Sequence, residues 1–223
     1  MRAMPILDAK RAIVLLVSGL TLASLPAFPE PPKDRPQALA ALSSADAATR
    51  AEAIVWVANL GAMADAPLLH ERLRDESPFV RGFAERGLWL LWGRSGDAAI
   101  DALMARGSEE MQAGALRQSI ATFSEVIKKK PDFAEGWNRR ATAYYLSGQF
   151  RRSLADCDEV LKRNPAHFGA ISGVGQIYTR LQDYDKALAW FRRALDVNPN
   201  MLGVEFNIQE VEQLLKERRG RAI

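Results

Sequence analysis

The feature that most constrains this chain is a proline that returns at a fixed interval in its C-terminal half. Pro131, Pro165 and Pro199 are spaced 34 residues apart, which leaves room for two short helices and their turns. Because proline cannot continue a helix, each of the three ends one unit. Counting back from them divides this half into units 100–133, 134–167 and 168–201.

Equivalent positions of the units carry similar side chains. The third unit has small residues at Gly175 and Ala187, where we expect two helices to cross, because a larger side chain would hold the backbones apart. The other matches are Trp137, Tyr144, Gly148 and Val160 in the second unit and Tyr178, Phe191 and Ala194 in the third. The first unit is degenerate: Phe123 and Val126 fit, Leu103 and Gly107 match weakly, and Glu110 and Ser119 depart from the pattern.

This pattern resembles the tetratricopeptide repeat, and residues 183–199 are especially similar to the second helix of such a repeat. The resemblance implies an all-α fold, in which the helix-turn-helix units stack as a right-handed α-solenoid. It also implies a concave side, lined by the first helix of each unit, where family members hold a peptide or a partner helix. Residues 202–219 then read as one amphipathic helix, which we expect to cap the last unit.

A second, fainter repeat occupies residues 36–99. Pro36 aligns with Pro67 and Arg50 with Arg81, so that each proline opens one helix and each arginine lies near the start of the next. These helix starts resemble HEAT-type helical repeats. We expect a HEAT-like pair that extends the solenoid toward the N-terminus. The alternative is a pair of generic helical hairpins that stack on the array.

The first residues of the chain, 1–27, have the pattern of a secretory signal peptide. Three basic residues precede an apolar stretch, 12–27, which is too short to span a membrane as a helix. We expect cleavage after Ala23 or Ala27, followed by a proline-rich linker at 28–35. The pattern predicts export, to the periplasm if the source is a Gram-negative bacterium. The alternative is an uncleaved segment that anchors the protein to a membrane.

The balance of charge disfavours a nucleic acid as partner. The chain has 30 basic and 27 acidic residues, a net charge of +3. Without three basic residues and Asp8 of the leader, the counts become 27 and 26, a net charge of +1. Nucleic-acid binding requires a concentrated basic face, which this even distribution does not predict.

No set of residues indicates catalysis, and we expect neither an enzyme nor a bound metal or cofactor. His70 and His167 have no histidine or cysteine beside them, as a metal site would need. We expect His70 to face solvent and His167 to be an ordinary turn residue. Cys157 falls at the packing position of Phe123 and Phe191, so we expect a buried, inert thiol. The tryptophans of the N-terminal region are expected in its core: Trp56, Trp89 and Trp92.

The candidate partner-binding residues lie on the first helices of the second and third units, where packing does not require them. Their amides, hydroxyls, one tyrosine and two arginines suit an extended peptide. They are Asn138, Arg139, Thr142, Tyr145, Ser172, Gln176, Thr179 and Arg180. We expect Gly169 and Gly173 to open space beside them, and Arg139 and Arg180 together to suit one acidic side chain.

One subclass of the family clamps a C-terminal carboxylate with Lys, Asn and Arg from successive first helices. In this chain Met104 and Ser108 stand in the first unit and glycines in the third, so we expect that clamp to be absent. The resemblance therefore implies an exported, non-catalytic scaffold or adaptor that binds another protein or a peptide segment through the concave face. The alternative is a structural subunit whose repeats stack in an oligomer without a free peptide groove.

Overall fold

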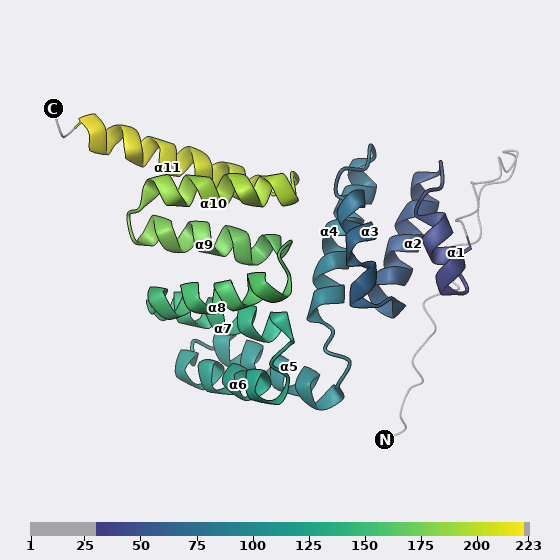
Figure 1. The fold of residues 1–223 in the computed structure, drawn as a ribbon, viewed down its shortest axis with the longest axis horizontal. Helices are drawn as coiled ribbons and strands as arrows, with labels where there is room; N and C mark the ends of the chain where they lie inside the picture. The colour runs from purple at the N-terminus through teal and green to yellow at the C-terminus, as the bar shows by residue number, and fades with distance from the viewer. Residues whose placement is uncertain (1–29, 221–223) are drawn as a thin grey trace, which may run out of the picture.

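A computed structural model describes residues 30–220 of the 223-residue chain, so the expected signal peptide lies outside the described residues. The described part has eleven α-helices, one 3-10 turn and no strand. None of these helices is both long and apolar enough to cross a membrane. The expected all-α solenoid of helix-turn-helix repeats is confirmed, and its helices stack one above another in the C-terminal part of the molecule (Figure 1).

The repeat array consists of three helix pairs and one final helix. The helices are α5 (Ala98–Gln112) with α6 (Leu116–Lys129), α7 (Ala134–Leu146) with α8 (Phe150–Arg163), α9 (Phe168–Arg180) with α10 (Tyr184–Val197), and then α11 (Leu202–Gly220). Helices α7, α9 and α11 begin at the residues that the proline spacing gave as unit starts. Each proline lies in the turn that joins one unit to the next.

A glycine faces a phenylalanine where the two helices of the first and third units cross. A β-carbon at Gly107 would lie 2.6 Å from the Phe123 ring, and one at Gly175 would lie 2.6 Å from the Phe191 ring. Both distances are well inside the ~3.5 Å at which two carbon atoms pack. Small residues are therefore required here, as the sequence predicted for Gly175.

The turn between the two helices of each unit needs a left-handed backbone conformation. Gly114 and Gly148 supply it in the first two units, each with a φ of +74°. Gln182 occupies the same position of the third unit with a φ of +59°. Residues with a β-carbon adopt this conformation at a cost, so Gln182 stores strain that the two glycines avoid.

The two departures of the first unit from the repeat pattern both have hydrogen-bond partners. The buried Ser119 hydroxyl donates to the Gly107 carbonyl over 2.9 Å. The Glu110 carboxylate accepts from Thr122 Oγ1 at 2.6 Å and from Arg106 Nε at 2.9 Å. The degenerate unit thus folds like its neighbours, and the second unit repeats the serine contact, since Ser153 donates to the Ala141 carbonyl over 2.7 Å.

The N-terminal region forms two further helix pairs. They are α1 (Arg35–Ala41) with α2 (Ala47–Leu60), and α3 (Ala66–Arg72) with α4 (Pro78–Gly93); the 3-10 turn Met63–Asp65 joins the pairs. A buried ion pair links them: Arg50 donates from Nε and Nη2 to Asp75 over 2.9 and 2.7 Å. Its Nη1 donates to the Ser44 and Ala45 carbonyls over 2.8 and 3.0 Å, which satisfies the guanidinium.

Arg81, the counterpart of Arg50 in the second pair, repeats this arrangement with a partner from the array. Its Nη1 donates to the Asp75 and Glu76 carbonyls over 2.9 and 3.2 Å. Its Nε donates to Asn200 Oδ1 over 2.9 Å. Asn200, in the turn between α10 and α11, therefore occupies the place that Asp75 holds for Arg50. The turn between α10 and α11 is thus bonded to the second N-terminal pair, since Asn200 Nδ2 also donates to the Leu73 carbonyl over 2.8 Å.

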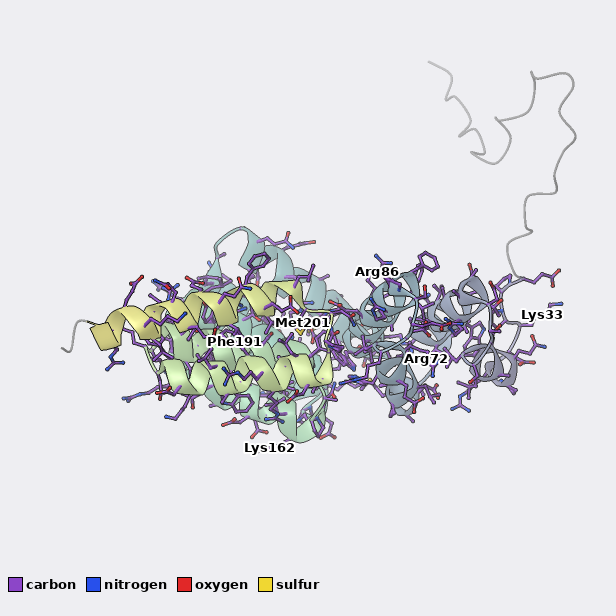
Figure 2. The ribbon with its side chains drawn as sticks, turned by 90° about the horizontal axis from the view of Figure 1, so that it is seen from above. Lys33, Arg72, Arg86, Lys162, Phe191 and Met201 are labelled. Carbon is purple, nitrogen blue, oxygen red and sulfur yellow. The ribbon has the colours of Figure 1, made fainter. Side chains whose placement is uncertain are left out.

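We expected a HEAT-like pair that extends the solenoid toward the N-terminus, and in the structure these helices do not continue the stack of the array. Helices α3 and α4 stand beside the ends of the stacked helices rather than on top of α5 (Figure 1). Figure 2 shows the helices that carry Arg72 and Arg86 alongside the array that carries Phe191 and Met201. The two parts share a core, because Phe168 of α9 is buried in the N-terminal cluster together with Trp92. The tryptophans do serve packing, as expected.

We predict that Gln182→Gly stabilises the protein. Glycine removes the strain of the left-handed turn, so the free energy of unfolding should rise by about 1 kcal/mol. Urea denaturation followed by circular dichroism measures it. The control Gln209→Gly, at an exposed position inside α11, should lower the same quantity by about 1 kcal/mol. A loss of stability in Gln182→Gly would show that the turn is not strained.

Candidate partner-binding groove

A pocket opens on the array between α7 and α9, the first helices of the second and third units. Its volume is about 70 Å³. Helix α8 supplies two floor residues, Ser153 and Cys157. The remaining lining comes from α7 and α9: Asn138, Ala141, Thr142, Tyr145, Gly169, Ala170, Gly173, Gln176 and Ile177. The pocket thus has a largely apolar floor and a rim of amides and hydroxyls.

The pocket exists because the second unit lacks the glycine–phenylalanine pair of its neighbours. Ala141 stands where the other units have glycine, and Cys157 stands where they have a phenyl ring. The cysteine side chain is much smaller than that ring, and both residues line the pocket. The expectation that Cys157 is buried at the packing position is confirmed, since it is 3% exposed.

Half of the predicted binding residues reach the pocket: Asn138, Thr142, Tyr145 and Gln176. Two others are held elsewhere by α9 itself. Ser172 is buried and donates its hydroxyl to the Gly169 carbonyl over 3.0 Å, so the prediction that packing leaves it free is wrong. Thr179 donates to the Gly175 carbonyl over 3.0 Å.

The two predicted arginines do not meet at the pocket. Arg139 donates from Nε to the Glu135 carboxylate over 2.7 Å. Arg180 lies over the ring of Phe150, 5.8 Å from its centre. Neither arginine lines the pocket. The structure therefore gives no support to a joint site for one acidic side chain.

The two glycines beside the pocket have different roles. A β-carbon at Gly173 would meet no atom within 4 Å, so this glycine does open space in the groove. A β-carbon at Gly169 would lie 2.2 Å from the indole of Trp89. Gly169 therefore leaves room for the α4 tryptophan, which packs against the N-terminal end of α9.

His167, which we expected to be an ordinary turn residue, is fully buried. Its Nδ1 accepts from the Ala170 backbone N–H over 3.1 Å, so the ring proton is on Nε2. Nε2 lies 3.1 Å from the buried Glu135 carboxylate and donates to it. The ring stacks on Trp92, with 4.4 Å between ring centres. The repeat register indicated that this position is buried, because the equivalent residues of the other units, Phe133 and Met201, are apolar.

The electrostatics of Glu135 follow from these contacts. Burial by itself would raise the pKa of the carboxyl group, but His167 and Arg139 hold it below its ordinary value. Asn138 Nδ2 also donates to this carboxylate over 3.0 Å, which leaves Asn138 Oδ1 as an acceptor at the pocket rim. The buried Glu135 carboxylate thus orients Asn138, one of the polar residues that line the pocket.

His70 does not face solvent, contrary to the prediction from sequence. It is half-buried, with its ring centre 5.7 Å from that of Trp92 and 6.5 Å from that of Phe168. Burial lowers its pKa, and the nearby His167 and Arg74 lower it further. His70 therefore belongs to the aromatic junction between the N-terminal pairs and the array.

The chemistry of the pocket favours binding over reaction. Burial, with Asp156 and Asp158 nearby, raises the pKa of the Cys157 thiol to about 12. The thiol is the unreactive form, because the thiolate is the nucleophile. Within residues 30–220, no group of three or more His, Cys, Asp or Glu side chains is arranged to hold a metal ion.

Comparison with known proteins gives consistent matches. The tetratricopeptide repeat family matches residues 104–150 and 140–201. A TPR repeat-containing protein of Rhizobium etli is 30% identical over 151 residues, which are 68% of this chain and 72% of that protein.

Two solved structures share the fold of the array. The Sgt2 TPR domain from Aspergillus fumigatus has a TM-score of 0.54 at 19% identity, over 57% of this chain and 85% of that one. The first TPR of Spaghetti (RPAP3), bound to the HSP90 peptide SRMEEVD, has a TM-score of 0.50 at 21% identity, over 52% of this chain and 93% of that one.

We predict that acid loosens the junction through His70. Because its pKa is lowered in the folded state, the unfolded chain, with a pKa near ~6.5, binds the proton more readily. The stabilisation that neutral His70 contributes is therefore complete above about pH 6.5, and it declines as the pH falls toward the pKa of His70 in the folded state. Urea denaturation at pH 7.5 and 5.5 measures it. Between pH 7.5 and pH 5.5, wild type should lose more free energy of unfolding than His70→Gln. Equal losses would show that His70 is not the group responsible.

Proposed function

The chain belongs to the tetratricopeptide repeat family, and from this premise we propose that it is a non-catalytic scaffold that binds an extended segment of another protein. The observation that carries the proposal is the pocket between α7 and α9, on the face lined by the first helices. The first TPR of RPAP3, whose structure holds a bound HSP90 peptide, supports a peptide ligand for an array of this fold.

The rim of the pocket suits a peptide backbone. Gln176 is exposed, and its amide both donates and accepts hydrogen bonds. Asn138 keeps a free acceptor in its Oδ1, and the exposed Thr142 hydroxyl, which donates to the Asn138 carbonyl over 3.0 Å, can accept a hydrogen bond. An extended peptide presents N–H and C=O groups that these side chains can pair, while its own side chains point alternately to the floor and to solvent.

The face at the end of the stack supports a scaffold over a stacking subunit. In the second and third units, the side that receives the second helix of the same unit carries apolar or aromatic residues, such as Ile171, Gly175 and Tyr178. The equivalent residues of α11 are polar: Glu205, Gln209 and Glu212, of which Glu212 pairs with Arg192 of α10. Such a face ends a solenoid and does not favour another copy packing on it. A stable multimer in size-exclusion chromatography would favour the structural alternative.

We further propose that this scaffold works outside the cytoplasm, in a periplasm if the source is a Gram-negative bacterium. The support is the basic start and the apolar stretch 12–27 of the sequence. If the segment stays uncleaved, the same scaffold is tethered to the membrane surface.

We predict that Gly173→Leu blocks partner binding without loss of stability. The new side chain enters open space beside the pocket, so partner recovery should fall at least about tenfold, the effect of ~1.4 kcal/mol. Removing a glycine from the interior of α9 should also raise the free energy of unfolding by about 1 kcal/mol. Affinity enrichment from the native exported fraction, quantified by mass spectrometry, measures the recovery.

The matched control for this experiment is Gly82→Leu. Gly82 also lies inside a helix with space around it, but in the N-terminal region, on α4. This variant should recover the partner as wild type does. Equal recovery by Gly173→Leu and wild type would refute binding in the groove.

We predict that the mature protein begins after Ala23 or Ala27. Intact-mass measurement and N-terminal sequencing of protein from the exported fraction would locate the terminus. Replacing two residues of the apolar stretch, Leu15→Arg with Leu16→Arg, should retain the full-length precursor in the cytoplasm. A mature protein that still starts at Met1 would support the membrane-anchored alternative instead.

A further inference from the structure

Phe206 is the most exposed large apolar side chain among the described residues, at 70%. Leu202, one helical turn earlier on α11, is 68% exposed. Neighbours four residues apart on a helix share a face, so the two form a single apolar patch. A scaffold that ends its stack with a polar face has no structural need for this patch.

The repeat register places Phe206 on the concave side. Val204 and Val211 of α11 are buried, as are Ala170 and Ile177 at the equivalent positions of α9. Helix α11 therefore packs in the same orientation as α9. Its Phe206 is equivalent to Asn138 on α7, which lines the pocket, and to Ser172 on α9, which is buried and does not line it. The polar end face of Glu205, Gln209 and Glu212 is a different side of α11.

A charge accompanies this aromatic residue. Glu210 follows Phe206 by one turn and is exposed. Its equivalents, Gln176 and Thr142, are uncharged rim residues of the pocket. The groove thus becomes more apolar and more acidic from α7 to α11.

We propose that the groove selects a segment with two apolar side chains, a small one for the pocket and a large one for Phe206 and Leu202, with a basic residue next to the large one. This inference rests on the proposed function and names the partner's chemistry at the same site. The pocket sets the size of the first side chain. Its volume of about 70 Å³ is roughly half of the ~150 Å³ cavity that accommodates benzene, so it takes an alanine, valine or threonine side chain.

The helix spacing sets the separation of the two side chains. Neighbouring packed helices lie ~8–10 Å apart, and the pocket lies between α7 and α9, so Phe206 is one to one and a half spacings away. An extended peptide advances ~3.3 Å per residue. The two apolar residues are therefore about two to five positions apart. Glu210 then favours Lys or Arg beside the larger one and repels an acidic segment, unlike the peptide SRMEEVD in the RPAP3 structure.

Random 12-residue peptides displayed on phage provide the probe, panned against the full chain. The enriched peptides should share the apolar pair at this spacing with a flanking basic residue. One enriched peptide, synthesised with a fluorescent label, is then titrated against variants by anisotropy. Phe206→Gln should weaken binding at least fivefold and Gly173→Leu at least tenfold. Leu60→Gln, at a 67% exposed residue of the N-terminal region, should change nothing. Glu210→Lys, panned afresh, should select an acidic flanking residue.

The possible outcomes separate this inference from the proposed function. Peptides that need Gly173 but bind Phe206→Gln as well as wild type would overturn the inference and leave the groove function intact. Selection of acidic segments by wild type would overturn it as well. If no peptide is enriched, or Gly173→Leu binds normally, both proposals fail. Because Phe206 is exposed, Phe206→Gln should melt within about 2 °C of wild type, and equal melting shows that lost binding is not lost folding.

Discussion

The crossing of the two helices within each repeat governs the rest of this structure. A glycine must face a phenylalanine there, because no β-carbon fits against the Phe123 or Phe191 ring. The second unit meets the same constraint with a smaller pair, Ala141 and Cys157. The helices still pack, but the volume of a phenyl ring is missing. The pocket at that place is therefore a consequence of repeat packing with one reduced pair, and it needs no special loop.

A second constraint fixes what surrounds the pocket. The hydrogen bonds from Arg50 to Asp75 join the two N-terminal pairs to each other. An equivalent hydrogen bond from Arg81 to Asn200 joins the second pair to the array. The HEAT-like stack therefore runs across the repeat array and presses Trp89 against Gly169. Gly169, which lines the pocket, is therefore in direct contact with the N-terminal region. The buried pair of Glu135 and His167 links the aromatic contacts with α4 to Asn138 at the pocket rim.

Sequence reasoning recovered what depends on local periodicity and missed what depends on contacts between the two stacks. The proline interval gave the starts of α7, α9 and α11, and the register placed Cys157 correctly. His70 and His167 were misjudged, because both are covered where the α3–α4 pair meets α9. Ser172 looked free, since a helix pattern does not show a hydroxyl returning to its own backbone. The orientation of the stacks was also missed, because Asn200 is one polar residue in a turn and carries no repeat signal.

Helix α11 shows how one segment can serve two purposes without conflict. A helix has separate faces, and here one packs on α10 through Val204 and Val211 while another ends the stack with charged residues. The third face carries Phe206 and Glu210, at the repeat positions that Asn138 and Gln176 hold at the pocket rim. It is a separate side of the helix, so its residues need not be polar like those at the end of the stack. An exposed phenylalanine on the capping face would invite another copy to bind. Phe206 instead lies at the repeat position that Asn138 holds at the pocket rim, where it can contact an extended chain bound in the groove.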